Sequence, residues 1–281
     1  MLFSIQVMVG KWVDERGEPL RIGQFALPES QQAVPLVSFG QNILDKGDLL
    51  GIVDVAWLKG TQKSFSELIP SLIYGVTNEI SVLVELPFAL KFQSEQAVSR
   101  GVKDLLLQVE GVVFAPEKAS TIDEITLVAN IEFPTGTLTE EPLTGMGTLN
   151  FFFGFTASYT GPEWYYFISS GMTLTTTRKK TKFGNEFLYQ CGISKNISYR
   201  ANKWLFNWMI ELNGAYAQRD KISGLIDCNT GGNVLLLGPS LWFSTQRFLM
   251  QGGISGVVFE HLFGTQHKNK YFVAAAVGCK F

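Results

Sequence analysis

The residues of this sequence that could take part in chemistry are mostly acids that alternate with apolar residues along short stretches of chain. Seven glutamates share this pattern: Glu79, Glu85, Glu110, Glu124, Glu132, Glu186 and Glu211. If these stretches are strands around a pore, the acids face its lumen, and rings of acids favour cations or basic solutes. The other interpretation is that a pore wall is simply polar, with its acids paired to lysine or arginine. We take this second interpretation as the default.

Enzymatic signatures are missing from the sequence. No Gly-x-Ser-x-Gly elbow is present, and both histidines, His261 and His267, fall in one predicted loop. No pair of acids carries a motif of a general acid and base. The three cysteines, Cys191, Cys228 and Cys279, are widely spaced and lack a Cys-x-x-Cys motif. We therefore predict three unpaired thiols, no metal, no cofactor and no enzyme.

A short basic run has a different character. Arg178, Lys179, Lys180 and Lys182 lie within five residues in a predicted loop. They are candidates for contact with lipid phosphates outside the cell, through charge-assisted hydrogen bonds. A solvated loop tip explains the same residues equally well.

Composition restricts the elements that could hold these residues. Apolar residues make up 46% of the 281-residue chain and charged residues only 17%, with 28 glycines and 22 phenylalanines. So many glycines argue against a helical bundle. No stretch reaches the roughly 18 apolar residues of a transmembrane helix, so a membrane protein of this composition must be a β-barrel. The net charge of −2 gives no indication of nucleic-acid binding.

Strict two-residue alternation supports this conclusion, most clearly at the C-terminus. From Tyr271 to Phe281, every second residue forms an apolar face suited to lipid, whereas the opposite face is small and ends on Lys280. Tyr271 and Phe281 are the predicted assembly signal at the end of the last strand. The stretches 122–134, 146–158 and 204–217 alternate in the same way.

The chain divides into about twelve such strands, an even number that puts both termini of the chain on one side of the membrane. They are predicted at 47–58, 67–76, 79–92, 103–115, 122–134, 146–158, 163–176, 184–196, 204–217, 232–244, 247–259 and 270–281. These strands are longer than the five or six residues usual in soluble sheets. Aromatic residues also gather near strand ends, as in an interfacial girdle: Trp57, Tyr74, Trp164, Tyr165, Tyr166, Trp204, Tyr216 and Tyr271.

The connections and the N-terminus complete the predicted layout. Connections on the side of the termini are mostly tight, as at Thr77-Asn78, and those on the other side are longer, as at 218–231. This is the arrangement of outer-membrane barrels, with short periplasmic turns. Residues 1–46 are predicted to be an irregular leader or plug-like segment before a barrel of residues 47–281. Their start lacks the basic region of a signal peptide, and we expect a signal segment to precede it.

Several short motifs resemble one known family. Pro70 to Phe88 (PSLIYGVTNEISVLVELPF) resembles paired strands of the outer-membrane family associated with the meta-pathway of phenol degradation. Lys103 to Phe114 resembles another strand of that family, although Lys103 stands where the family usually has glycine. Phe133 to Gly136 (FPTG) resembles its strand-ending step, which is followed by Gly145 and Gly147. The resemblance spans roughly residues 47–281. It implies a monomeric barrel that passes small, often apolar or aromatic, compounds.

The sequence thus predicts an all-β protein, an antiparallel transmembrane β-barrel of about twelve strands in a bacterial outer membrane. The leading hypothesis for function is a channel or transporter for small solutes. The alternatives are a non-conducting barrel with a structural or adhesive role and a soluble β-sandwich or lipid-binding barrel. The expected partners are outer-membrane lipids and lipopolysaccharide, the barrel assembly machinery and a small solute of unknown identity.

Overall fold

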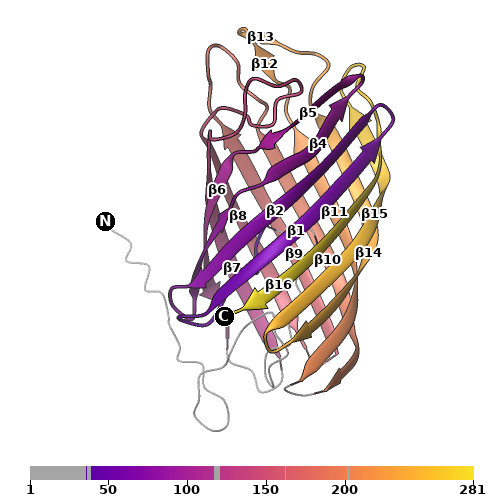
Figure 1. The fold of residues 1–281 in the computed structure, drawn as a ribbon. Helices are drawn as coiled ribbons and strands as arrows, with labels where there is room; N and C mark the ends of the chain where they lie inside the picture. The colour runs from indigo at the N-terminus through magenta and orange to yellow at the C-terminus, as the bar shows by residue number, and fades with distance from the viewer. Residues whose placement is uncertain (1–35, 37–38, 117–120, 162, 201–202) are drawn as a thin grey trace, which may run out of the picture.

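The structure, a computed structural model, describes Leu36 and residues 39–116, 121–161, 163–200 and 203–281. It is a closed barrel of tilted antiparallel strands (Figure 1). In chain order the strands are β1 (Leu49–Gly60), β2 (Lys63–Gly75), β3 (Ile80–Glu85), β4 (Phe88–Ser94), β5 (Ala97–Val102), β6 (Leu105–Phe114), β7 (Ile122–Phe133), β8 (Asn150–Thr160), β9 (Trp164–Thr175), β10 (Glu186–Arg200), β11 (Trp204–Ala217), β12 (Lys221–Ile222), β13 (Leu225–Ile226), β14 (Gly232–Thr245), β15 (Phe248–Leu262) and β16 (Asn269–Lys280). The described residues include no helix long and apolar enough to cross a membrane.

The barrel wall has twelve strands, as the sequence predicts. The sheet contains fourteen strands, but β3 with β4 and β5 with β6 each continue a single wall strand. The wall closes where β1 pairs with both β2 and β16, with Asp54 opposite Ala276 in the register. The separate hairpin β12–β13 lies beyond the wall. We call the end where β16 finishes the base and the opposite end, which carries this hairpin, the rim (Figure 1).

Proline explains why one wall strand is interrupted. Pro87 separates β3 from β4 and has no N–H to give to the ladder. Its carbonyl still accepts a hydrogen bond from the Lys103 N–H at 2.9 Å, and Leu86 N–H donates to the Pro70 carbonyl at 3.2 Å. The interruption therefore changes the local pairing without opening the sheet between these strands.

The predicted alternation of faces is confirmed. In β16, Ala274 and Ala276 are buried inside the barrel, whereas Val277 lies exposed on its outer surface. In β7, Thr126 is buried and the next residue, Leu127, is exposed. Because neighbouring strands keep the same register, these outward residues form a continuous apolar surface of the kind that faces lipid.

Aromatic side chains border this apolar surface at both ends. Trp57 and Tyr271 pack edge-to-face near the rim, with ring centroids 5.8 Å apart. Tyr159 and Tyr166 are paired near the base, also 5.8 Å apart. The prediction was wrong for Tyr165, which is 3% exposed and packs inside the barrel beside Phe167. Its place in the alternation, between outward Trp164 and Tyr166, requires it to face inward.

The connections follow the predicted arrangement at most positions. Longer loops at the rim join β7 to β8, β9 to β10 and β11 to β14, and Thr245 and Phe248 flank a tight turn at the base. Two rim connections are much shorter than predicted. β1 and β2 are joined through Thr61-Gln62, and β4 and β5 through Glu95-Gln96. These strands continue past the stretches in which apolar and polar residues alternate strictly, so the pattern that predicts strands ends before they do.

A buried acid anchors the rim loop 134–149, where the family-like FPTG step begins. One carboxylate oxygen of Asp104 accepts the Gly136 N–H at 2.8 Å, and the other accepts the Met146 N–H at 2.7 Å. A Cβ on Gly136 would lie 2.6 Å from the Cα of Gly145, so the two glycines allow the loop ends to meet. Loop 134–149 thereby lies next to β5.

We expect Asp104→Ala to release this loop. The substitution leaves two backbone N–H groups without their acceptor, at a cost of about 1–3 kcal/mol. Hydrogen exchange at the amides of Gly136 and Met146 should accelerate, whereas exchange in β8 should not change. Asp104→Asn keeps one oxygen acceptor and should give an intermediate effect. Unchanged protection of both amides in Asp104→Ala would show that the loop is held by other contacts.

The terminal residue Phe281 lies at the base on the outer surface, 77% exposed, and its N–H donates to the Leu49 carbonyl at 2.8 Å. We expect deletion of Phe281 to impair assembly far more than stability, because it removes only one ladder hydrogen bond but also the terminal aromatic. Heat-modifiable gel migration of membrane fractions measures the assembled share. Phe281→Tyr, which keeps an aromatic ring, is the control, and normal insertion of the deletion variant would contradict the assembly role.

Candidate functional site

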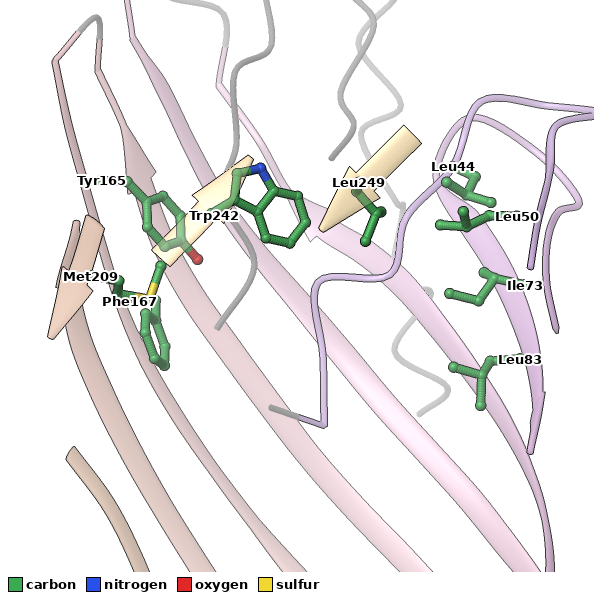
Figure 2. Close-up of a cluster of buried hydrophobic side chains, with 9 residues drawn as sticks. All are labelled: Leu44, Leu50, Ile73, Leu83, Tyr165, Phe167, Met209, Trp242 and Leu249. Carbon is green, nitrogen blue, oxygen red and sulfur yellow. The ribbon is translucent and has the colours of Figure 1, made fainter. Parts of the chain in front are cut away.

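A stretch of chain before β1 lies inside the barrel. We call this stretch, Leu36 together with residues 39–46, the inner segment. Near the base, Leu44 N–H donates to the Ser81 hydroxyl on β3 at 2.8 Å. The Leu44 side chain belongs to a buried apolar cluster whose members on this wall are Leu50, Ile73 and Leu83 (Figure 2). The inner segment is therefore packed against the wall where it enters.

The next contact is with a glutamate that the sequence predicts to face the lumen. Glu110 on β6 is 1% exposed, and its carboxylate accepts the backbone N–H groups of Gln41 and Asn42, the latter at 2.9 Å. Beside it, the Gln108 amide donates to the Phe39 carbonyl at 3.0 Å. Two side chains of one wall strand thus bind the backbone of the inner segment.

The far end of the inner segment reaches the opposite side of the barrel. Leu36 N–H donates to both carboxylate oxygens of Glu211 on β11, at 3.0 and 2.9 Å. The Ser240 hydroxyl on β14 donates to the same carboxylate at 2.6 Å. In the sheet, four strands lie between β6 and β11 by the shorter route. The inner segment therefore crosses the lumen from one wall to the other.

Aromatic side chains line the lumen around this crossing. Phe39 packs edge-to-face on Phe152 of β8, with centroids 4.7 Å apart. A Cβ on Gly171 would lie 2.2 Å from the Phe152 ring, so this glycine makes room for the ring. Figure 2 shows a second group of inward side chains, which includes Tyr165, Phe167 and Trp242. The lumen wall thus offers aromatic surface as well as polar groups.

The other predicted lumen acids lie at different heights. Glu124 on β7 is 3% exposed and close to Glu110. Glu132 on β7 accepts a hydrogen bond from the Asn150 amide at 3.0 Å, and Glu186 on β10 lies near it at the rim half. Glu85 on β3 accepts the Ser71 hydroxyl at 3.4 Å. Glu79 differs, because it lies in the turn between β2 and β3 rather than in a wall strand.

Pairing of acids with basic residues is found in only part of the lumen. Lys103 forms an ion pair with Glu67 at 2.7 Å, and Asp54 and Glu85 are close to Glu67. Glu67 was not among the predicted lumen acids. Within the ranges that the structure describes, Glu110 and Glu124 have no lysine or arginine partner. The default interpretation of paired acids therefore applies at Glu67, and it stays a prediction at Glu110 and Glu124. Whether the predicted acids select a solute stays a prediction.

The basic run lies in the rim loop between β9 and β10. Lys179 and Lys180 are exposed at its tip, and Arg178 donates to the Gly147 carbonyl at 3.3 Å. Lys182 pairs through its backbone with Lys221 of the β12–β13 hairpin. Asp220 lies in the same loop region, and burial raises the pKa of its carboxyl. The hydrogen bond that the Gly184 N–H donates to this carboxyl acts in the opposite direction and lowers the pKa. Contact of the basic run with lipid stays a prediction.

No family model matches the sequence, and no curated protein matches it either. The comparison with solved structures does find relatives of the fold. The COG4313 outer membrane channel from Pseudomonas putida F1 superposes with a TM-score of 0.73 at 13% identity, over 88% of this chain and 100% of that chain. The NanC porin gives a TM-score of 0.50 at 10% identity, over 82% of this chain and 98% of that chain. The fold is that of an outer-membrane β-barrel.

An outer-membrane barrel accounts for the two surfaces described above. Its apolar outer face and aromatic borders suit a bilayer, and its polar inner face suits a lumen. Among the described residues, no group of three or more His, Cys, Asp or Glu side chains could hold a metal ion. Inside the barrel, polar side chains of several wall strands, such as Glu110 and Glu211, form hydrogen bonds with the inner segment. That region is the candidate functional site.

Proposed function

We propose that this chain is a passive outer-membrane channel for small solutes, and that the inner segment acts as its plug. The observation that carries the proposal is the crossing of the lumen by the inner segment, held by Glu110 on one wall and Glu211 on the other.

The lining of the barrel supports passage of polar solutes and water. Buried inward residues on neighbouring strands are mostly hydroxyls and amides, such as Thr156 with Ser169 at 2.8 Å and Asn207 with Ser194 at 2.6 Å. A polar inner wall of this kind is typical of conducting barrels. Smaller barrels of about eight strands can instead fill their interior with side chains.

The way in which the inner segment is bound supports its release. Its described residues form no strand pairing with the wall. Hydrogen bonds to Glu110, Glu211, Ser81, Gln108 and Asn78 hold them, together with the buried Leu44 side chain. A hydrogen bond to a charged group contributes about 1.5–3 kcal/mol. Breaking a few such bonds costs much less than unfolding a wall strand, so the barrel can stay intact while the plug leaves.

The class of solute belongs to the proposal as well. The resemblance to the family of the phenol meta-pathway implies small apolar or aromatic compounds. Phe152 on the lumen wall is covered by Phe39 of the inner segment, and release of the segment would uncover a ring on which such compounds can stack. We further propose that the chain works as a monomer and not as an enzyme, that its basic rim loop contacts lipopolysaccharide, and that the barrel assembly machinery inserts it.

Conductance in planar bilayers tests the channel function. We expect the purified full chain to give discrete current steps that alternate with long closed periods, as a reversible plug requires. Liposomes that contain the protein should take up benzyl alcohol or small sugars faster than empty liposomes do. If neither current steps nor faster uptake were observed, the barrel would be structural or adhesive.

A further inference from the structure

We propose that Glu110 and Glu124 form a recognition site for the ammonium or guanidinium group of a small organic cation, which competes with the inner segment for Glu110. This inference rests on the proposed channel function and names the class of solute for it. It goes against the default expectation that the acids of a barrel lumen are paired internally.

Glu110 and Glu124 are two neighbouring acids inside the barrel. Glu110 on β6 and Glu124 on β7 are on adjacent strands and face the lumen, 1% and 3% exposed. They are close enough for their charges to interact. No lysine or arginine pairs with either one within the described ranges. A cation held beside two buried carboxylates stabilises their ionised forms, which burial otherwise disfavours.

Glu124 also offers a hydrogen-bond acceptor that no described residue uses. Within the part of the chain that the structure describes, one carboxylate oxygen of Glu124, Oε2, is fully buried and has no hydrogen-bond partner. Buried polar atoms are almost always paired, so an orphaned one in a native structure points to a missing partner. The Glu124 carboxylate can only accept hydrogen bonds when ionised, and the missing partner is then an N–H or O–H donor.

The inner segment occupies Glu110 through a pair of backbone donors. Two neighbouring N–H groups, from Gln41 and Asn42, donate to its two oxygens. An ammonium or guanidinium group presents the same paired donors and adds a positive charge. Charge-assisted hydrogen bonds are roughly twice as strong as neutral ones. An organic cation can therefore replace the inner segment at Glu110 and use Glu124 as well.

The surroundings favour an organic cation over a metal ion. A Cβ on Gly40 would lie 3.3 Å from Val128 and 3.4 Å from the Glu110 carboxylate, so apolar wall surface adjoins the acid. Phe39 and Phe152 pack next to this region. Calcium takes six to eight oxygen ligands, whereas this site offers two carboxylates beside hydrocarbon. That combination suits a charged head group with an apolar body.

Calorimetric titration of the full chain in detergent with three matched probes tests the site. Benzylammonium carries the cation, benzyl alcohol is its neutral analogue, and benzoate carries the opposite charge. We expect benzylammonium to bind at least about ten-fold more tightly than benzyl alcohol, and benzoate not to bind. Glu110→Gln and Glu124→Gln should each weaken benzylammonium about ten-fold or more, since each removes one charged acceptor.

Glu132→Gln is the matched control, because Glu132 is also a lumen glutamate on β7 but accepts a hydrogen bond from Asn150. It should change benzylammonium affinity less than two-fold. Heat-modifiable migration verifies that every variant is folded. Equal affinity for benzylammonium and benzyl alcohol, or affinity unchanged in both glutamate variants, would overturn the site.

The binding experiment and the conductance experiment test the cation site and the channel function separately. Current steps without a preference for benzylammonium would reject this site and leave the channel standing. Specific binding without any current would reject the channel and leave the site standing.

Discussion

In the channel that we propose, a disulfide between Gly40→Cys and Thr156→Cys will close the lumen, and its reduction will reopen it. A Cβ built on Gly40 lies 2.8 Å from Thr156 Oγ1, the position that a cysteine sulfur would take. Across a disulfide with an S–S bond of about 2.05 Å, each Cβ lies about 3 Å from the partner sulfur, so this spacing suits a disulfide. The bond would fix the inner segment to β8 inside the lumen. We expect the oxidised protein to show at least ten-fold fewer open events in planar bilayers than the same protein after reduction.

Two controls separate this effect from simple crowding of the lumen. The native cysteines, which are all free, are first replaced by serine so that only the new pair can form a disulfide. Gly40→Cys alone adds the side chain without the bond and should respond to oxidant no more than the cysteine-free parent does. If the oxidised pair conducts like the reduced pair, the inner segment does not gate the lumen, and solutes take another path through the barrel.

The wall of this barrel could be predicted from sequence because each residue faces one of two very different media. Leu127 faces lipid and Thr126 faces the lumen, so hydropathy alternates with the period of the strand. Near the rim, water lies on both sides of the sheet, and the strict alternation of hydropathy is lost. The predicted strands therefore ended before the turns at Thr61-Gln62 and Glu95-Gln96. The predicted boundaries are therefore reliable within the apolar surface and poor at the rim.

The candidate site was only half predictable. Alternation alone places Glu110 and Glu211 on the inner face. It cannot reveal that both bind the inner segment, because these contacts join Asn42 to Glu110 and Leu36 to Glu211 across 68 and 175 residues. Their donors are backbone N–H groups, which every residue except proline carries. A backbone contact of this kind leaves no mark in the residue types of the segment.

The outer surface allows an independent test of the fold through the depth of two phenylalanines. Phe155 is the sixth of the eleven residues of β8, whereas Phe248 is the first residue of β15, beside the tight turn at the base. Both face outward, at 42% and 56% exposed. An arginine on the lipid face of a barrel costs about 2–4 kcal/mol at the bilayer midplane and about 0–1 kcal/mol near the interface. We expect Phe155→Arg to destabilise the barrel by the larger amount and Phe248→Arg by the smaller.

Reversible unfolding in urea from phospholipid vesicles measures the two free energies of unfolding. The comparison is informative because the two side chains are both largely exposed but lie at different depths of the proposed bilayer. In a soluble β-sandwich, water would surround both positions, and each substitution would change the free energy of unfolding by about 0.5 kcal/mol or less. Equal costs for the two variants would therefore contradict the placement of β8 in the centre of the bilayer, and with it the assignment of the apolar surface to lipid.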